Sequence, residues 1–398
     1  TGSWWQFPTS GAAPAKGSFG PLFEASVRRR LIADVQVGTL LSGGLDSSSI
    51  TAVAASLSQR RLPAFTVRYD GLEMDEGEYA SAAAQQAGVD HYEVRIAADE
   101  MPGLLVDATW HLDEPINFPA SPDTLAVSRY ASKHVRVLLT GETADELFGG
   151  YGRLRLYRYP LLVKMTGHAL APFRSRLRFG SRWARAVAST TLDRAEWIAV
   201  SYADGDPTRF TRLPLTEWAP YRARVAADAV RDHDEPVLQA LAYERQTHLV
   251  SIVATGDRLT MAAAIEERLP FTDPALLEFA GRSRKADLFR GVQGKQPLRE
   301  AMAGRLPQIV LDRRKRGWMS PYPDYLRQNP VLSTWLAQVP AHDIVATSPL
   351  GRAGARQIID GFLAGDPARD RDAWMLGRIV LWHQVCVEGN RNPFGGAA

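Results

Sequence analysis

The sequence predicts an α/β protein, with a parallel twisted sheet covered by helices on both faces and a mostly helical carboxyl-terminal part. Short apolar runs rich in β-formers alternate with helical stretches of about ten residues, a pattern typical of βαβ units. Beyond Tyr151 the strand signals fade, and residues 220–285 and 295–390 look mostly helical.

Each element of the expected sheet has its own signal. The strands are short, apolar and β-branched, at 35–41, 63–69, 91–96 and 135–140. The helices are longer and in part alanine-rich, at 22–32, 48–58, 76–87, 98–110 and 124–133. In such a sheet, ligands bind beyond the carboxyl ends of the strands.

Composition bounds the function classes. The 398 residues are 45% hydrophobic and 23% charged, a globular balance that excludes a disordered or collagen-like chain. The net charge of +3 is too small to indicate nucleic acid by itself. The single cysteine, Cys386, excludes an internal disulfide framework and a cysteine-based zinc site. We see no membrane-length apolar run and no signal peptide, so we expect a cytoplasmic protein with no membrane partner.

Four segments are expected along the chain. Residues 1–20 are rich in Gly, Pro, Ser and Ala and are typical of a linker or arm. Its aromatic residues Trp4, Trp5 and Phe7 either pack on the domain surface or once bridged to another domain. The α/β core follows at 21–151, then a basic helical insertion at 152–215 and a helical part at 216–398.

A glycine-rich loop, LSGGLDSS, follows the first expected strand at 41–48. Its two glycines let the backbone turn sharply, and N–H groups at the start of the next helix favour an anion. The loop lacks the lysine of the GxxxxGK[ST] phosphate loop. A carboxylate beside phosphate needs a cation, so Asp46 predicts Mg²⁺. The plainer interpretation is a glycine-rich helix start capped by Asp or Ser.

A second loop, TGETADELFGGY at 140–151, follows the fourth expected strand and holds three acids within five residues. Asp145 is well placed to complete a Mg²⁺ site with Asp46. Alone, these acids could simply favour the start of a helix. Two such loops at strand carboxyl ends argue against coincidence.

These motifs resemble a known family. SGGLDSSS at 42–49 resembles the pyrophosphate loop of N-type ATP pyrophosphatases, and the second loop resembles a signature of the asparagine synthetases. Three further segments agree in order. They resemble D-R-x-S-M…E-x-R-x-P-F-x-D at 257–273, K-x-x-L-R at 295–299 and R-K-x-G-F at 314–318. The resemblance covers about residues 22–390. Relatives of this family include β-lactam synthetases and lasso-peptide cyclases.

The resemblance implies a ligase that uses ATP to adenylate a carboxylate, releases pyrophosphate, and transfers the acyl group to ammonia or an amine with loss of AMP. ATP and Mg²⁺ are the implied cofactors, with Asp46 and Asp145 as metal ligands. Pyrophosphate would be held by Ser42, Gly43, Gly44, Asp46 and Ser47. Adenosine would contact Leu41, Val67, Thr140 and Gly141.

The resemblance also implies two catalytic residues. Lys315 matches the family's catalytic lysine, whose ammonium can stabilise charge on the α-phosphate and acyl oxygens. The plainer interpretation of residues 313–316 is a solvated basic run or an RNA-type patch. Glu142 matches the family's glutamate, which could act as general base on the attacking amine. In β-lactam-forming relatives a tyrosine stands there, so Glu142 argues against β-lactam closure.

Other matched residues have open roles. Lys295 could reach phosphate or brace the fold. Glu266, Arg268 and Asp273 could orient substrate or form a buried ion-pair network. Residues 113–115 resemble a stretch near the acceptor pocket, although their acids could be a capping feature. His111 is expected to be a packed or surface histidine.

Two features depart from the family. Its full-length members begin with a glutaminase domain that has a nucleophilic cysteine, and we expect no such domain within these 398 residues. Cys386 is expected to be an inert core thiol. The segment 147–192 holds nine basic residues and no acid: Arg153, Arg155, Arg158, Lys164, Arg174, Arg176, Arg178, Arg182 and Arg185. With its interleaved aromatics it could bind RNA or an acidic peptide, or dock a partner.

Several functions stay open. The leading one is an amide-forming ligase acting on aspartate, a natural-product acid or a peptide carboxylate, as in lasso-peptide cyclases. Ammonia or an amine would be the second substrate, with a separate glutaminase or peptide-binding protein as a partner. An ATP pyrophosphatase that modifies RNA rests only on the basic segment, so nucleic acid is not expected as a partner. A non-catalytic subunit disagrees with the intact set of Asp46, Asp145, Glu142 and Lys315.

Overall fold

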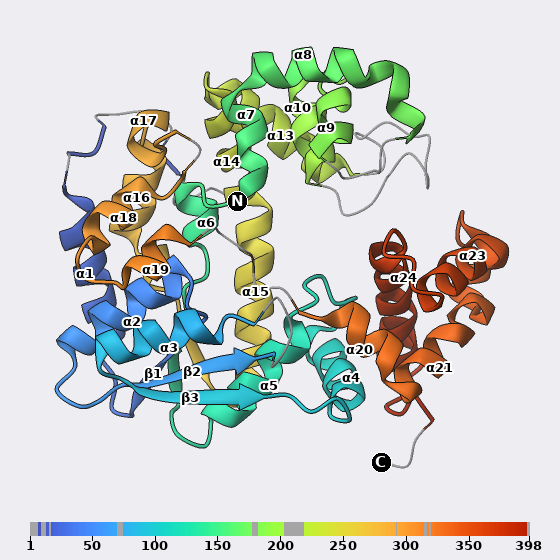
Figure 1. Cartoon of the computed structure of the whole chain (residues 1–398), viewed down its shortest axis with the longest axis horizontal. Helices are drawn as coiled ribbons and strands as arrows, with labels where there is room; N and C mark the ends of the chain where they lie inside the picture. Colours follow the sequence, from blue (N-terminus) through green and yellow to red (C-terminus); the bar gives the residue numbers. More distant parts are fainter. Residues whose placement is uncertain are drawn as a thin grey trace, which may run out of the picture.

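The computed structural model describes residues 7–8, 13–15, 17–69, 75–176, 182–202, 219–291, 293–313, 317 and 320–395. It contains one parallel sheet with strand order β3-β2-β1-β4-β5, of which Figure 1 labels β1, β2 and β3. The strands are β1 (Val37–Leu40), β2 (Pro63–Arg68), β3 (Asp90–Arg95), β4 (Val137–Leu139) and β5 (Glu266–Arg268). The predicted fold class is confirmed.

Side chains that alternate along the strands build a core on each face of the sheet. Ala64, Val137 and Leu139 belong to one core, and Phe65 and Leu138 belong to the other. The first core includes α1 (Phe19–Arg30), α2 (Leu45–Leu57) and α3 (Gly77–Ala87), while α5 (Ser121–Ala131) packs in the second. The helices thus cover both faces, as expected.

Strand β5 was not predicted and lies in a region expected to be helical. Its residues are Glu266, Glu267 and Arg268, so the sequence shows no apolar run there. The strand forms because it pairs with β4 at the edge of the sheet, with Leu138 opposite Glu267. Glu266 and Arg268 lie on the same side of β5 and form an ion pair at 2.8 Å. Glu267 points to the other side.

Helices make up most of the remaining chain. One group connects to the α/β core: α4 (Met101–Leu112), α6 (Ala144–Phe148), α7 (Arg155–Arg158), α8 (Pro160–Leu170), α9 (Arg182–Ala188), α10 (Arg194–Ser201), α13 (Pro220–Asp232), α14 (Pro236–Gln246), α15 (His248–Met261), α16 (Pro274–Arg282), α17 (Lys285–Leu288), α18 (Gln296–Met302) and α19 (Gln308–Asp312).

The carboxyl-terminal helices form a third core together with α4. They are α20 (Tyr322–Gln328), α21 (Pro330–Gln338), α22 (Asp343–Ala346), α23 (Gly351–Leu363) and α24 (Asp370–Trp382), followed by a π-helical turn η5 (His383–Val387). Figure 1 shows α21, α23 and α24 grouped away from the sheet. Cys386 lies half-buried in η5 and packs against this core without being fully within it, and burial raises the pKa of its thiol. No helix among the described residues is long and apolar enough to cross a membrane.

The amino-terminal arm contacts the folded chain where it is described. Phe7 packs against the first core, and the Arg245 guanidinium lies 5.5 Å from its ring centroid. Trp4 and Trp5 lie outside the described residues. Phe7 therefore packs on the domain surface, and α1 begins at Phe19.

Asp273 joins α1 to the start of α16. Its Oδ2 accepts hydrogen bonds from Arg29 at 2.7 Å and Arg30 at 2.8 Å, and its Oδ1 accepts from the Ala275 N–H at 3.1 Å. Burial raises the pKa of Asp273, but the hydrogen bonds from the two arginines outweigh it and leave the pKa below the ordinary 3.8. These contacts make Asp273 part of an ion-pair network between helices.

Replacing Asp273 with Asn is expected to lower the free energy of unfolding by about 2 kcal/mol, because the amide cannot neutralise the two guanidinium groups. Urea denaturation measures this loss. The aspartate's contribution is present above pH 3.8 and disappears as pH falls through the lower folded-state pKa. The difference in the free energy of unfolding between wild type and Asp273→Asn should therefore disappear in acid. The exposed pair of Asp228 and Arg231 gives the control, since Asp228→Asn should change stability far less than Asp273→Asn does. Equal stability of wild type and Asp273→Asn at neutral pH would contradict this assignment.

Candidate functional site

The two loops singled out in the sequence meet at one edge of the sheet. They follow β1 and β4, which are neighbouring parallel strands. Gly141 marks the contact, because a Cβ atom there would lie 2.7 Å from the Ser47 nitrogen and 3.1 Å from Asp46 Cβ. A side chain at this position would push the loops apart, so the close approach depends on glycine.

The first loop is a compact hydrogen-bonded turn. The Ser42 N–H donates to Ser47 Oγ at 3.1 Å, and the two hydroxyl oxygens lie 3.0 Å apart. Gly43 has a φ of 68°, and a Cβ there would lie 2.4 Å from the Ala80 nitrogen, so the loop rests directly on α3. Gly44 is the N-cap of α2, and no side chain caps this helix. Its first N–H groups therefore suit an anion.

Asp46 and Asp145, one from each loop, share the ammonium of Lys295. The Lys295 Nζ atom lies 2.5 Å from Asp46 Oδ2 and 2.6 Å from Asp145 Oδ1. All three residues are buried. Lys295 has a φ of 59°, and its N–H donates to the Phe148 carbonyl at 3.0 Å. Lys295 thus braces the junction of the two loops.

The same donor set suits a divalent cation. The two carboxylates come from separate loops and reach one cationic centre, so they lie close enough to bind a common ion. Mg²⁺ prefers one or two carboxylates together with phosphate oxygens. The residues present therefore fit Mg²⁺ beside a nucleotide.

A cavity of about 340 Å³ opens beside these loops. Its wall contains most of the residues that we expected to bind the nucleotide, to bind the metal ion or to act as the general base. They are Leu41, Ser42, Gly44, Asp46, Ser47, Val67, Thr140, Gly141, Glu142 and Asp145. Gly43 and Lys295 are not in this wall; Gly43 packs on α3, and Lys295 lines a second cavity. Lys315 lies outside the described residues, although Gly317 two positions later lines the cavity. Residues 113–115 are not in the wall either.

Part of the cavity wall was not predicted. His248 and Ile252 come from α15, and Phe118 precedes α5. The His248 ring centroid lies 5.5 Å from those of Phe118 and Tyr151. Tyr151 and Glu146 belong to the second loop motif, and the Tyr151 hydroxyl donates to Glu146. Phe118, His248 and Ile252 belong to none of the sequence motifs. They reach the cavity through tertiary packing, in which α15 contacts α5.

Glu142 forms a carboxyl pair with Glu267 of β5. A Cβ atom on Gly256 of α15 would lie 2.4 Å from Glu267 Oε2 and 3.0 Å from Glu142 Oε2, so both oxygens approach one glycine. Thr140 donates to Glu267 Oε1 at 2.7 Å. Within the described residues, Glu142 Oε2 has no hydrogen-bond partner.

The pair is basic. Burial raises the pKa of Glu142 well above its ordinary 4.5, and the charges of Glu267 and Glu146 raise it further. Burial also raises the pKa of Glu267 to about 7, against the opposing effect of the Thr140 hydrogen bond. Two close carboxyl groups cannot both ionise easily, so each carboxylate raises the proton affinity of the other.

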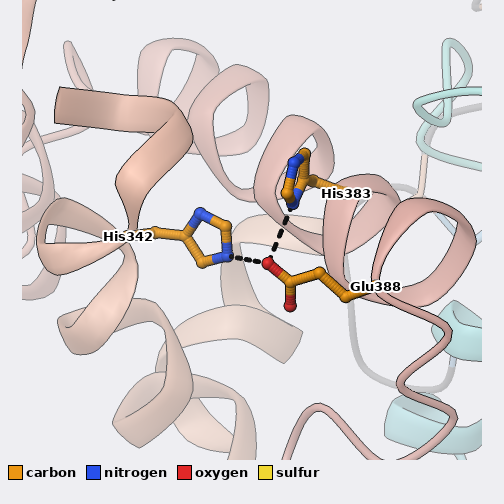
Figure 2. A group of neighbouring side chains, drawn as sticks. All are labelled: His342, His383 and Glu388. Atoms are coloured by element: carbon orange, nitrogen blue, oxygen red, sulfur yellow. Dashed lines mark hydrogen bonds and ion pairs between the residues drawn. The ribbon is translucent and has the colours of Figure 1, made fainter. Parts of the chain in front are cut away.

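A second cluster of titratable side chains lies in the carboxyl-terminal helices (Figure 2). Glu388 Oε1 lies 3.3 Å from His342 Nε2 and 3.0 Å from His383 Nδ1. The Ile344 N–H donates to His342 Nδ1 at 3.3 Å, which places the ring proton of His342 on Nε2, where it faces Glu388. A metal on Nε2 would oppose this arrangement, so we interpret the cluster as a hydrogen-bonded clasp.

Comparison with known proteins identifies relatives of this chain. A family model described as asparagine synthase matches residues 18–384. A putative asparagine synthetase [glutamine-hydrolyzing] of Mycobacterium bovis is 31% identical over 392 residues, which cover 94% of this chain and 58% of the relative. Asparagine synthetase [glutamine-hydrolyzing] 1 of Bacillus subtilis is 27% identical over 384 residues, which cover 92% of this chain and 59% of the relative. The amidase chry2 of Gibberella zeae is 27% identical over 354 residues, with coverage of 75% and 51%.

This chain spans little more than half the length of these curated relatives. The family model nevertheless covers most of the chain, and it includes both loops that meet at the cavity. The chain belongs to the asparagine synthase family.

Proposed function

We propose that this chain is the synthetase part of an ATP-dependent ligase that joins a carboxylate to ammonia or an amine. One observation carries the proposal: the acids of two separate loops converge on one cation-binding point beside a cavity. An acidic metal site next to helix N–H groups is suited to a nucleotide's phosphate chain.

Nucleotide binding would use the residues around the two loops. Asp46 and Asp145 would hold Mg²⁺, which would neutralise phosphate charge when bound. Ser42, Gly43, Gly44 and Ser47 would contact the phosphate chain, and Leu41, Val67, Thr140 and Gly141 would contact adenosine. Lys295 would keep the two carboxylates together or reach phosphate.

The proposed reaction has two chemical steps. A carboxylate oxygen of the acid attacks the α-phosphorus of ATP, and the bond to the β-phosphate breaks with its electron pair on pyrophosphate. Lys315 would stabilise the charge that develops on the α-phosphate and acyl oxygens. The amine nitrogen then attacks the acyl carbon, and AMP leaves with the electron pair of the broken C–O bond.

Glu142 would take the proton that the nitrogen loses. It lies in the cavity wall, and its basicity is raised by burial and by the neighbouring Glu267. A general base works best when its pKa lies near the working pH. Glu267 would act behind it as a positioning residue, because Glu267 itself is not in the cavity wall.

The cavity wall supports an amine as second substrate. Glu142 and Glu146 supply acids, and Phe118, Tyr151 and His248 supply aromatic rings. Such a wall attracts an ammonium group by charge and by cation–π contact. Aspartate with ammonia remains the simplest pair of substrates. A natural-product or peptide carboxylate joined to a substrate amine, as in a lasso-peptide cyclase, is the second candidate. A separate glutaminase is a further proposed partner.

An RNA-modifying role has less support. Arg153 of the basic segment donates to the buried Glu244 at 2.9 Å, and Arg158 is only 7% exposed. These two arginines turn inward and are therefore not part of a solvent-facing stripe for RNA.

Asp145→Asn should reduce AMP and pyrophosphate release by about a hundredfold or more, because a neutral amide binds Mg²⁺ weakly. The assay screens carboxylic acids, aspartate among them, with ammonia or amines across a Mg²⁺ titration. Asp34→Asn, at an exposed position, is the matched control and should keep full activity. Full activity of Asp145→Asn would refute the metal assignment.

Glu267→Gln should shift the acid limb of the pH–rate profile for amide formation to lower pH. The reason is that the pKa of Glu142, raised first by burial and next by the charge of Glu267, falls when that charge is removed. ATP–pyrophosphate exchange, which reports adenylation alone, should be unchanged. Glu266→Gln is the control, since Glu266 is exposed and pairs with Arg268. An unshifted limb in Glu267→Gln would remove Glu267 from the mechanism.

A further inference from the structure

A second cavity, of about 720 Å³, also borders the first loop. It shares Gly44, Asp46 and Tyr151 with the first cavity. Its remaining wall comes mainly from residues 149–154, from α7, from the turn at 289–295, and from Arg299 and residues 310–313. The two cavities therefore adjoin at the point where the phosphate chain of a nucleotide would lie.

The wall of this second cavity is strongly cationic. It contains two acids, Asp46 and Asp312, and six basic residues: Arg155, Arg158, Arg290, Lys295, Arg299 and Arg313. Lys295 pairs with Asp46 and Asp145, and Arg313 pairs with Glu76. Within the described residues, Arg155, Arg158 and Arg290 have no ion-pair partner. These three arginines therefore give the cavity wall positive charge that no acid neutralises among the described residues.

Arg158 gives the decisive observation. Its side chain lies in the cavity wall, yet the residue is only 7% exposed, and its guanidinium lies 4.6 Å from the Phe289 ring centroid. Its Nε and Nη1 atoms are buried and have no hydrogen-bond partner among the described residues. A buried guanidinium without an anion is costly, and burial lowers its pKa. An anionic ligand in the cavity would remove this cost.

We propose that the second cavity binds a phosphate-chain oxyanion through Arg158, assisted by Arg155 and Arg290. Guanidinium groups suit such oxyanions because their planar N–H forks match phosphate oxygens. The identity of the anion rests on the proposed function. The acyl-adenylate must stay in the first cavity until the amine attacks, so pyrophosphate would leave through the second. The distal phosphates of bound ATP are the other source of the same chemistry.

The test is calorimetric titration of inorganic pyrophosphate into the whole chain in Mg²⁺ buffer. Arg158→Met should raise the Kd for pyrophosphate by at least about tenfold, because it removes a buried charged contact. The Kd of Arg158→Lys should lie between those of wild type and Arg158→Met. Lys164→Met, an exposed change in the same basic segment, should bind as wild type does. Thermal melting of the ligand-free variants provides the second readout. Arg158→Met should melt no lower than wild type, since it replaces an unpaired buried cation.

A parallel titration with ATP separates the two sources. Weaker binding of pyrophosphate alone assigns the cavity to the released product, and weaker binding of both assigns it to the distal phosphates. Unchanged pyrophosphate affinity in Arg158→Met, or a loss that comes with a lower melting temperature, would overturn the proposal. AMP release is measured separately. Its absence with every acid would refute the ligase and not the anion site, whereas AMP release with unchanged pyrophosphate affinity in Arg158→Met would refute only the anion site.

Discussion

The contact of Lys295 with Asp46 and Asp145 is the constraint on which the site depends. Burying two carboxylates side by side is costly unless a cation lies between them. The lysine that provides it comes from the start of α18, far along the chain from both loops. Its left-handed backbone costs roughly 1–3 kcal/mol. The surrounding contacts hold this conformation, including the hydrogen bond from its N–H to Phe148.

Glycine residues allow the close approaches from which this site is built. Gly141 lets the second loop touch the first, and a Cβ at Gly150 would lie 1.7 Å from Asp145 Oδ1. Gly256 makes room for the oxygens of Glu142 and Glu267. Backbone therefore approaches charged groups where a side chain would separate them. The glycines of the loops are structural requirements of the site as well as turn-formers.

The two cavities have opposite electrostatic character. The first joins acids to aromatic rings and suits an amine, while the second carries excess arginine and suits phosphate oxyanions. The loop with Gly44 and Asp46 borders both of them. Such a division would hold the acyl-adenylate on one side and its leaving group on the other, which would disfavour the reverse reaction by separating the products.

The α/β class and four of the five strands could be predicted from the sequence, because apolar runs and glycine-rich turns are local signals. It also indicated the two loops, since Asp46 and Asp145 lie in compact motifs at strand ends. Such signals need no knowledge of distant contacts.

Tertiary structure decided the rest. The charged strand β5 has no local signal and forms only by pairing with β4. Pairing places Glu267 beside Glu142, and packing of α15 adds Gly256 and His248. The inward position of Arg158 was hidden within a basic segment whose sequence suggests that it binds RNA, an acidic peptide or a partner protein. In each case the side chain's role depends on burial and on partners more than 100 residues away or on another element, which residue type and spacing do not encode.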